Sequence, residues 1–270
     1  MTFHESVINL SNNYFDTAAD LLQRGTLDPE AIHDIRVLMK RLRGLLRLYA
    51  VAGQRAEADQ LNPVLRDVAK AFAGQRDAHV LADTLGQCAR NAGKRLAVRL
   101  LAIRDGLQQD ADETVAPDLV ALQNELAWAQ QQWNAWFAEQ DDQRLLDPLA
   151  QLYRRNRKQG REALRLRDQE VLHDWRKRVK YLHYQLCALP DASLHHDDLL
   201  QRTRKLGSLL GKVHDLDVLV DYLQQQHLDE PDIHRLLAKR RTRLVKKIRR
   251  LYRRIFQHPT REFRKRIAAT

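Results

Sequence analysis

Apolar residues recur at helical spacing along most of this chain. Between His33 and Tyr49, which reads HDIRVLMKRLRGLLRLY, apolar side chains come every three or four residues and cover one face of a helix. Asp28-Pro29-Glu30 is a typical helix start and Gly53 a typical stop. The same rhythm predicts further helices over 5–24, 55–85, 89–112, 118–138, 145–166, 172–186, 195–226 and 230–257. Pro63 predicts a bend or break in the helix over 55–85.

The pattern predicts an all-α protein, because no run of alternating apolar and polar residues is flanked by turn signals. Short turns between the early helices favour antiparallel packing. Residues 1–270 are expected to form one domain, and the predicted divisions are a first helical bundle at 4–112, an acidic bridging segment at 113–144, a second bundle at 145–258 and a basic tail at 259–270.

The bridging segment is set apart by its acids and its tryptophans. Trp128, Trp133 and Trp136 lie on its helix, and aromatic side chains at helical spacing usually pack into a core. Its acidic residues are unsuited to binding a polyanion, so we expect them on an outward surface.

A row of hydrogen-bond donors lies beside the apolar face of the helix over 33–49. On a helical wheel the row falls within an arc of roughly 80°, and it extends along the axis for about 21 Å. Its members are His33, Arg36, Lys40, Arg43 and Arg47. Such a row suits an extended polyanion better than a compact substrate. The alternatives are an ordinary solvated helix face and, for the histidine, a buried capping role.

The row is repeated in the second half of the chain. His33-Asp34-x-Arg36-x-x-x-Lys40 recurs as His173-Asp174-x-Arg176-x-x-x-Lys180. His183 falls in the same arc as the second row, and Tyr184 lies just beyond it. A second echo relates RDAHVL at 76–81 to HDLDVL at 214–219. Two related halves predict two antiparallel helical bundles related by a pseudo-twofold axis, with both rows facing a basic central groove.

Other cations are expected to extend this groove. The helix over 145–166 carries Arg154, Lys158 and Arg161 at the same spacing, and Lys212 precedes the second echo. The last helix is basic around most of its circumference, and Arg250 and Arg253 are its expected contributors. That helix either closes the groove, extends it, or forms a separate surface for nucleic acid or membrane.

Charge and composition narrow the partners. Lys and Arg total 46 against 35 for Asp and Glu, a formal net charge of +11, which favours nucleic acid, an anionic membrane or a phosphate polymer. No apolar run approaches the ~20 residues of a membrane span, and the N-terminus lacks the features of a signal peptide. Cys88 and Cys187 are isolated, which fits a reducing cytoplasm and gives no zinc site.

Recurring His-Asp doublets raise the alternative of a metal-dependent phosphohydrolase. They occur at 33–34, 173–174, 196–197 and 214–215. Neighbouring side chains on a helix diverge by about 100°, and nearby Arg and Lys would repel a divalent cation. The chain has no recognisable nucleophile-and-base pair and no Gly-rich phosphate loop. We therefore expect no catalytic residues, no metal and no cofactor.

Three segments resemble a known family: HDIRVLMKRLRGLLRLY at 33–49, HDWRKRVKYLHY at 173–184 and GKVHDLDVL at 211–219. Together they resemble the CHAD domain, the conserved histidine α-helical domain, over nearly the whole chain. The resemblance implies paired helical bundles whose basic central channel binds inorganic polyphosphate. The chain departs from an exact repeat at two places. The first half has Gln75-Arg76-Asp77 where the later half has Val213-His214-Asp215, and it has Arg43 where the later half has His183.

The expected function is therefore cytoplasmic binding of inorganic polyphosphate, with targeting to polyphosphate granules as an extension. The alternatives are a nucleic-acid-binding protein and, less favoured, a metal-dependent hydrolase. The residues expected to bind polyphosphate are His33, Arg36, Lys40, Arg43, Arg47, Arg154, Lys158, Arg161, His173, Arg176, Lys180, His183, Tyr184, Lys212, Arg250 and Arg253.

Overall fold

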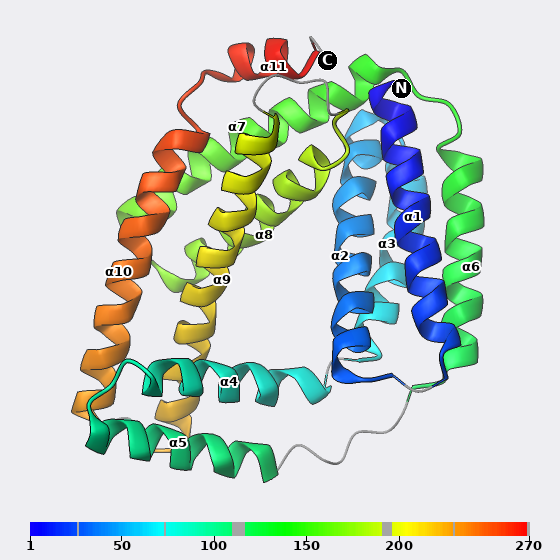
Figure 1. The fold of residues 1–270 in the computed structure, drawn as a ribbon. Coiled ribbons are helices and arrows are strands. Elements are labelled where there is room, and N and C mark those ends of the chain that lie inside the picture. The colour runs from blue at the N-terminus through cyan, green and yellow to red at the C-terminus, as the bar shows by residue number, and fades with distance from the viewer. Residues whose placement is uncertain (26, 73, 110–116, 191–195, 229, 269–270) are drawn as a thin grey trace.

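A computed structural model describes residues 1–25, 27–72, 74–109, 117–190, 196–228 and 230–268 (Figure 1). This part of the chain forms eleven α-helices and no strand, so the predicted all-α class is confirmed. None of these helices is both long enough and apolar enough to cross a bilayer.

Four helices pack together at the N-terminal side of the molecule: α1 (Phe3–Gln23), α2 (Pro29–Ala52), α3 (Arg55–Lys70) and α6 (Leu119–Trp136). The Asp28 side chain caps α2, and Gly53 ends it with a φ of 116°, a conformation that favours glycine. The α1 and α3 helices each contact both α2 and α6. Tyr49 of α2 stacks on Phe137 with ring centroids 4.0 Å apart, next to the fully buried Trp133. This aromatic cluster joins α6 to α2.

Five helices form the C-terminal side: α7 (Asp142–Leu166), α8 (Gln169–Leu186), α9 (His196–Gln225), α10 (Pro231–Ile255) and α11 (Thr260–Ala268). The α8 helix packs between α7 and α9, and α10 packs on α9. Gly160 allows α7 to approach its neighbours closely, because a Cβ there would lie 2.6 Å from Trp175 Cζ2 and 2.7 Å from Tyr252 Cε2. The tail helix α11 is held on α7 by Phe263, which stacks on Tyr153 with centroids 4.0 Å apart.

The two remaining helices, α4 (Gly74–Ala89) and α5 (Lys94–Gln109), pack on each other, and α4 crosses to contact α9 (Figure 1). Their second, smaller core combines Leu85, Cys88 and Leu100 with Leu219 of α9 and Leu237 of α10. The prediction of one helix over 55–85 is therefore wrong. The helix ends at Lys70, and Pro63 lies inside α3. A proline removes a single backbone hydrogen bond, whereas the break lets α4 bury its apolar face against α9.

The packing partners can be compared with the predicted divisions. Within residues 4–112, α2 packs on α1 and α3, whereas α4 packs on α5 and α9. The predicted bridging segment, 113–144, contains α6, which packs on α1 and α3. The α10 helix packs in the same way on α7 and α9. The predicted tail at 259–270 contains α11, packed on α7. Residues 113–116 of the acidic segment lie outside the described residues.

Candidate anion-binding site

The two repeat helices, α2 and α8, meet along a close seam. A Cβ at Gly44 would lie 2.8 Å from Tyr184 Cδ2, so the ring of Tyr184 occupies the space that a side chain would need. Next to it, Gln185 Nε2 donates to the Gly44 carbonyl oxygen at 2.9 Å. These contacts fix the rotation of α2 relative to α8. A basic cavity lies on each side of the seam, and no described residue lines both.

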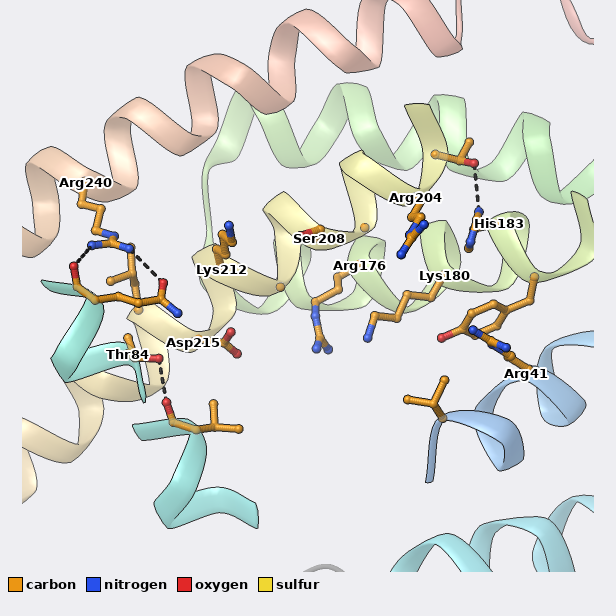
Figure 2. Close-up of a pocket in the computed structure, with 18 residues that line it drawn as sticks. Arg41, Thr84, Arg176, Lys180, His183, Arg204, Ser208, Lys212, Asp215 and Arg240 are labelled. Carbon is orange, nitrogen blue, oxygen red and sulfur yellow. Dashed lines mark hydrogen bonds between the residues drawn. The ribbon is translucent and has the colours of Figure 1, made fainter. Parts of the chain in front are cut away.

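The first cavity, which we call the α4-side cavity, has a volume of about 390 Å³ and is bounded by α2, α4, α8, α9 and α10 (Figure 2). Figure 2 shows Arg176 and Lys180 extending from α8 towards the space between α9 and α2. One carboxylate, Asp215, stands among the described lining residues. The cations that line it are Arg41, Arg176, Lys180, Arg204, Lys212 and Arg240.

Small residues of α9 make room for the long side chains of α8. A Cβ on Gly207 would lie 3.8 Å from Lys180 Cγ, and a Cβ on Gly211 would lie 3.7 Å from Arg176 Nε. Both distances are ordinary van der Waals contacts. Ser208 lies between them on the lining. The aliphatic parts of Arg176 and Lys180 therefore run close along α9, and their charged ends reach the cavity.

Arg240 differs from the other cations because it joins two helices. Its Nη1 donates to the Gln87 carbonyl oxygen at 2.7 Å, and its Nη2 donates to the Gln87 side-chain oxygen at 3.1 Å. These bonds hold α10 to the end of α4. Arg240 therefore positions the wall of the cavity as well as adding charge to it.

Two histidines beside the cavity are held in the neutral form. Burial, followed by the charges of Arg41 and Arg204, lowers the pKa of His183 to about 4. Burial, followed by Arg176, lowers the pKa of His214 to about 4 as well. His214 Nδ1 lies 3.1 Å from His173 Nδ1, so one of the two nitrogens must accept a hydrogen bond. Both shifts combine burial, the larger cause, with the positive charge of nearby arginines.

The structure brings together part of the predicted set. Arg176, Lys180, His183, Tyr184 and Lys212 line the α4-side cavity. His173 adjoins them through His214.

The predicted row on α2 is placed differently. Arg43 and Arg47 line the other cavity, across the seam. Arg36 donates from Nη1 to the Ala69 carbonyl oxygen of α3 at 2.9 Å, and His33 and Lys40 line neither cavity. The physical reason is that Gly44 faces α8, so Arg43 and Arg47 lie on the opposite flank of α2 from Arg41. The two predicted rows therefore do not line one cavity along their full length.

The remaining predicted cations are exposed and line neither cavity. They are Arg154, Lys158 and Arg161 on α7 and Arg250 and Arg253 on α10. Their helices turn apolar faces inward instead, through residues such as Leu164 and Ile248.

Three cations of the cavity were not predicted: Arg41, Arg204 and Arg240. A signal for Arg204 existed, because Arg204, Ser208 and Lys212 follow each other at intervals of four on α9. Arg41 is adjacent in sequence to the predicted row, and only the rotation of α2 brings it to the cavity.

The described residues contain no group of three or more His, Cys, Asp or Glu side chains placed to hold a metal. Asp174 of the second doublet instead pairs with Lys177 at 3.0 Å. The side chains of the doublet at 196–197 lie outside the part of the chain that is described, as do those of Arg76, Asp77 and His79 in the first echo.

The fold and the cavity define an all-helical protein with a strongly cationic site beside the contact of two related helices. The chain belongs to the CHAD domain family, whose model matches residues 14–224. No curated protein and no solved structure matches the chain.

Proposed function

We propose that the α4-side cavity binds inorganic polyphosphate. The observation that carries the proposal is the convergence of five cations, from α2, α8 and α9, on one cavity that has a single carboxylate among its described lining residues; they are Arg41, Arg176, Lys180, Arg204 and Lys212. Membership of the CHAD family, which is associated with polyphosphate-related proteins, supports the same partner.

The donor types suit a phosphate chain. Guanidinium groups present a planar fork to two oxygens, and the ammonium groups of Lys180 and Lys212 act as mobile point charges. Recognition of single-stranded nucleic acid usually needs aromatic rings on which bases stack. Among the described lining residues, the one phenylalanine, tyrosine or tryptophan is Tyr184, which is half-buried with its ring packed over Gly44. A phosphate chain without bases therefore fits this lining better than RNA or DNA.

The proposal extends to the architecture. We infer that α1, α2, α3 and α6 correspond by a pseudo-twofold axis to α7, α8, α9 and α10, because each set has the same pattern of neighbours. The repeat helices α2 and α8 then face each other at the centre, and a long polymer would pass beside their seam. A protein that holds long polyphosphate in this way would be carried to cytoplasmic polyphosphate granules.

The test is a binding titration with long-chain polyphosphate, comparing Lys180→Ala/Lys212→Ala with the wild type. Each lysine contributes a charge-assisted hydrogen bond, so the pair should lower affinity by at least roughly tenfold. The matched control is Lys94→Ala/Lys239→Ala, which removes two exposed lysines that line neither cavity. Equal affinities of the two double variants would overturn the assignment of the cavity.

Competition separates the polymer from nucleic acid. RNA and single-stranded DNA of equal charge are added to the preformed polyphosphate complex. We expect them to displace polyphosphate weakly. Displacement as efficient as that by unlabelled polyphosphate would favour the nucleic-acid alternative.

A further inference from the structure

The second cavity lies across the seam from the first, between α2, α3, α7 and α8, and we call it the α7-side cavity. Its volume is about 470 Å³. Apolar side chains such as Leu46, Pro148 and Leu152 form part of its wall. Its charged lining residues are Arg43, Arg47, Arg55, Asp59, Arg155, Asp174, Lys177 and Arg178.

Each of the two carboxylates is already matched by a neighbouring cation. Arg55 Nε lies 2.8 Å from Asp59 Oδ2, four residues away on α3. Lys177 Nζ lies 3.0 Å from Asp174 Oδ1 on α8. Both pairs are local to one helix, so they contribute little net charge to the cavity.

The four other arginines have no carboxylate within ion-pairing distance among the described residues. Arg43 Nε donates to Asn62 Oδ1 at 2.9 Å, and Arg178 Nη1 donates to Gln159 Oε1 at 2.7 Å. The Arg47 guanidinium lies over the Tyr181 ring, 4.2 Å from its centroid.

Arg155, on α7, has no hydrogen bond or ion pair with any described residue. Three helices therefore supply guanidinium groups to one cavity while providing only neutral partners for them.

The positive charges of these arginines repel one another. Burial lowers the pKa of Arg43, and the charges of Arg47 and Arg66 lower it further, whereas Tyr181 and Asp67 raise it. An anion in the cavity would relieve the repulsion and accept hydrogen bonds from the unused guanidinium N–H groups. Arginine without a carboxylate partner, gathered at a concave surface, is the usual chemistry of a phosphate site.

We propose that the α7-side cavity is a second phosphate-binding site, which takes a short chain of phosphates through Arg43, Arg47, Arg155 and Arg178. The site differs from that of the proposed function and does not depend on it, because the contact of Tyr184 and Gln185 with Gly44 stands between the two cavities. The phosphates come either from a separate oligophosphate or from the end of a polymer held in the α4-side cavity.

The direct test is calorimetry with inorganic tripolyphosphate at low salt on the full chain. We expect two binding events in the wild type, and Arg155→Ala/Arg178→Ala should weaken one of them by at least roughly tenfold. Lys180→Ala/Lys212→Ala should weaken the other. Arg90→Ala/Arg95→Ala, which removes two exposed arginines that line neither cavity, should weaken neither.

The proposal fails if Arg155→Ala/Arg178→Ala binds tripolyphosphate as the Arg90→Ala/Arg95→Ala control does. Thermal unfolding checks that each variant is folded. Arg155→Glu is the second variant, because this exposed side chain has no described partner to lose. If the α7-side variants bind tripolyphosphate as tightly as the wild type while Lys180→Ala/Lys212→Ala binds it more weakly, the α7-side site is refuted. The proposed function is then unaffected.

The source of the phosphate is resolved with long-chain polyphosphate. If Arg155→Ala/Arg178→Ala also weakens binding of the long chain, the polymer itself enters the α7-side cavity. If only tripolyphosphate binding is weakened, the ligand of this cavity is a separate short phosphate.

Discussion

At the scale of single residues, the cations around the α4-side cavity affect the pKa of two histidines. Neither His183 nor His214 carries a carboxylate partner in the described structure, and both are neutral at pH 7 because their pKa lies near 4. Burial is the largest cause of the low pKa of His214, followed by Arg176, His173, Lys177 and Lys180. Burial and the surrounding cations together therefore keep these imidazoles neutral. A bound polyanion would oppose the contribution of the cations.

Polyphosphate binding should accordingly take up protons. Phosphate oxygens beside His183 and His214 stabilise the imidazolium form and raise the pKa from about 4 towards or above the ordinary 6.5. The complex then binds more protons than the free protein below pH 6.5, so affinity rises as pH falls through that window, by up to roughly tenfold per pH unit for each fully coupled histidine. Calorimetry at pH 6 in two buffers of different ionisation enthalpy measures the uptake.

His214→Ala should reduce the proton uptake, whereas His227→Asn, which changes an exposed histidine outside both cavities, should leave it unchanged. Long chains are used because they have few titrating end groups. Equal uptake by the wild type and by both variants would show that His214 is not near the bound phosphate.

The sequence predicted the cations of α8 better than those of α2. Arg176 and Lys180 line the cavity because their row lies beside the apolar face that packs α8 against α7 and α9. The equivalent row on α2 has the same spacing, but the rotation of α2 is fixed by Tyr184, a residue of another helix. A helical wheel contains no information on that contact, so Arg41 could not be chosen over Lys40.

At the scale of elements, the seam between α2 and α8 determines which side chains reach each cavity. A methyl group on Gly44 would lie 2.8 Å from Tyr184 Cδ2 and 3.1 Å from Tyr184 Cβ, so the ring and its helix would have to move. Gly44→Ala should lower the free energy of unfolding by about 1–3 kcal/mol, the usual cost of overpacking a core. It should also weaken polyphosphate binding, because Arg41 and Arg176 would be displaced relative to each other.

The control for this prediction is Gly106→Ala on α5, where a Cβ meets nothing within 4 Å. Alanine is the better helix former, so this variant should be as stable as the wild type or slightly more stable. Denaturant unfolding measures both variants. A Gly44→Ala protein as stable as Gly106→Ala would mean that the seam is looser than its contacts imply.

Helix ends were predictable where the signal is local. The start of α2 is set by Asp28 and Pro29 and its end by Gly53, all readable from the sequence. The end of α3 is different, since the chain leaves α3 so that Leu85 and Cys88 can be buried against Leu219 of α9. That partner is more than 100 residues away in sequence, and the nearby Pro63 is a misleading local signal.

At the scale of the whole molecule, helices from distant parts of the chain supply the cations of one site, since Arg41 lies on α2 and the others lie on α8, α9 and α10. The α4 helix leaves α1–α3 for α9, and α6 occupies a place against α1 and α3. The α4-side cavity is therefore closed by α4 and α10, which Arg240 joins through Gln87. Folding of both halves is required before the cations converge.

Convergence of this kind predicts a steep dependence of polyphosphate affinity on salt. Each phosphate contact releases condensed counterions, so five contacting cations should give a slope of log Kd against log salt of roughly 3 to 5. Removing two of them in Lys180→Ala/Lys212→Ala should lower the slope by about 1 to 2, whereas Lys94→Ala/Lys239→Ala should leave it unchanged. Titrations at four salt concentrations measure it. A flat dependence, or equal slopes for both variants, would mean that the polymer is held by something other than this cluster of charges.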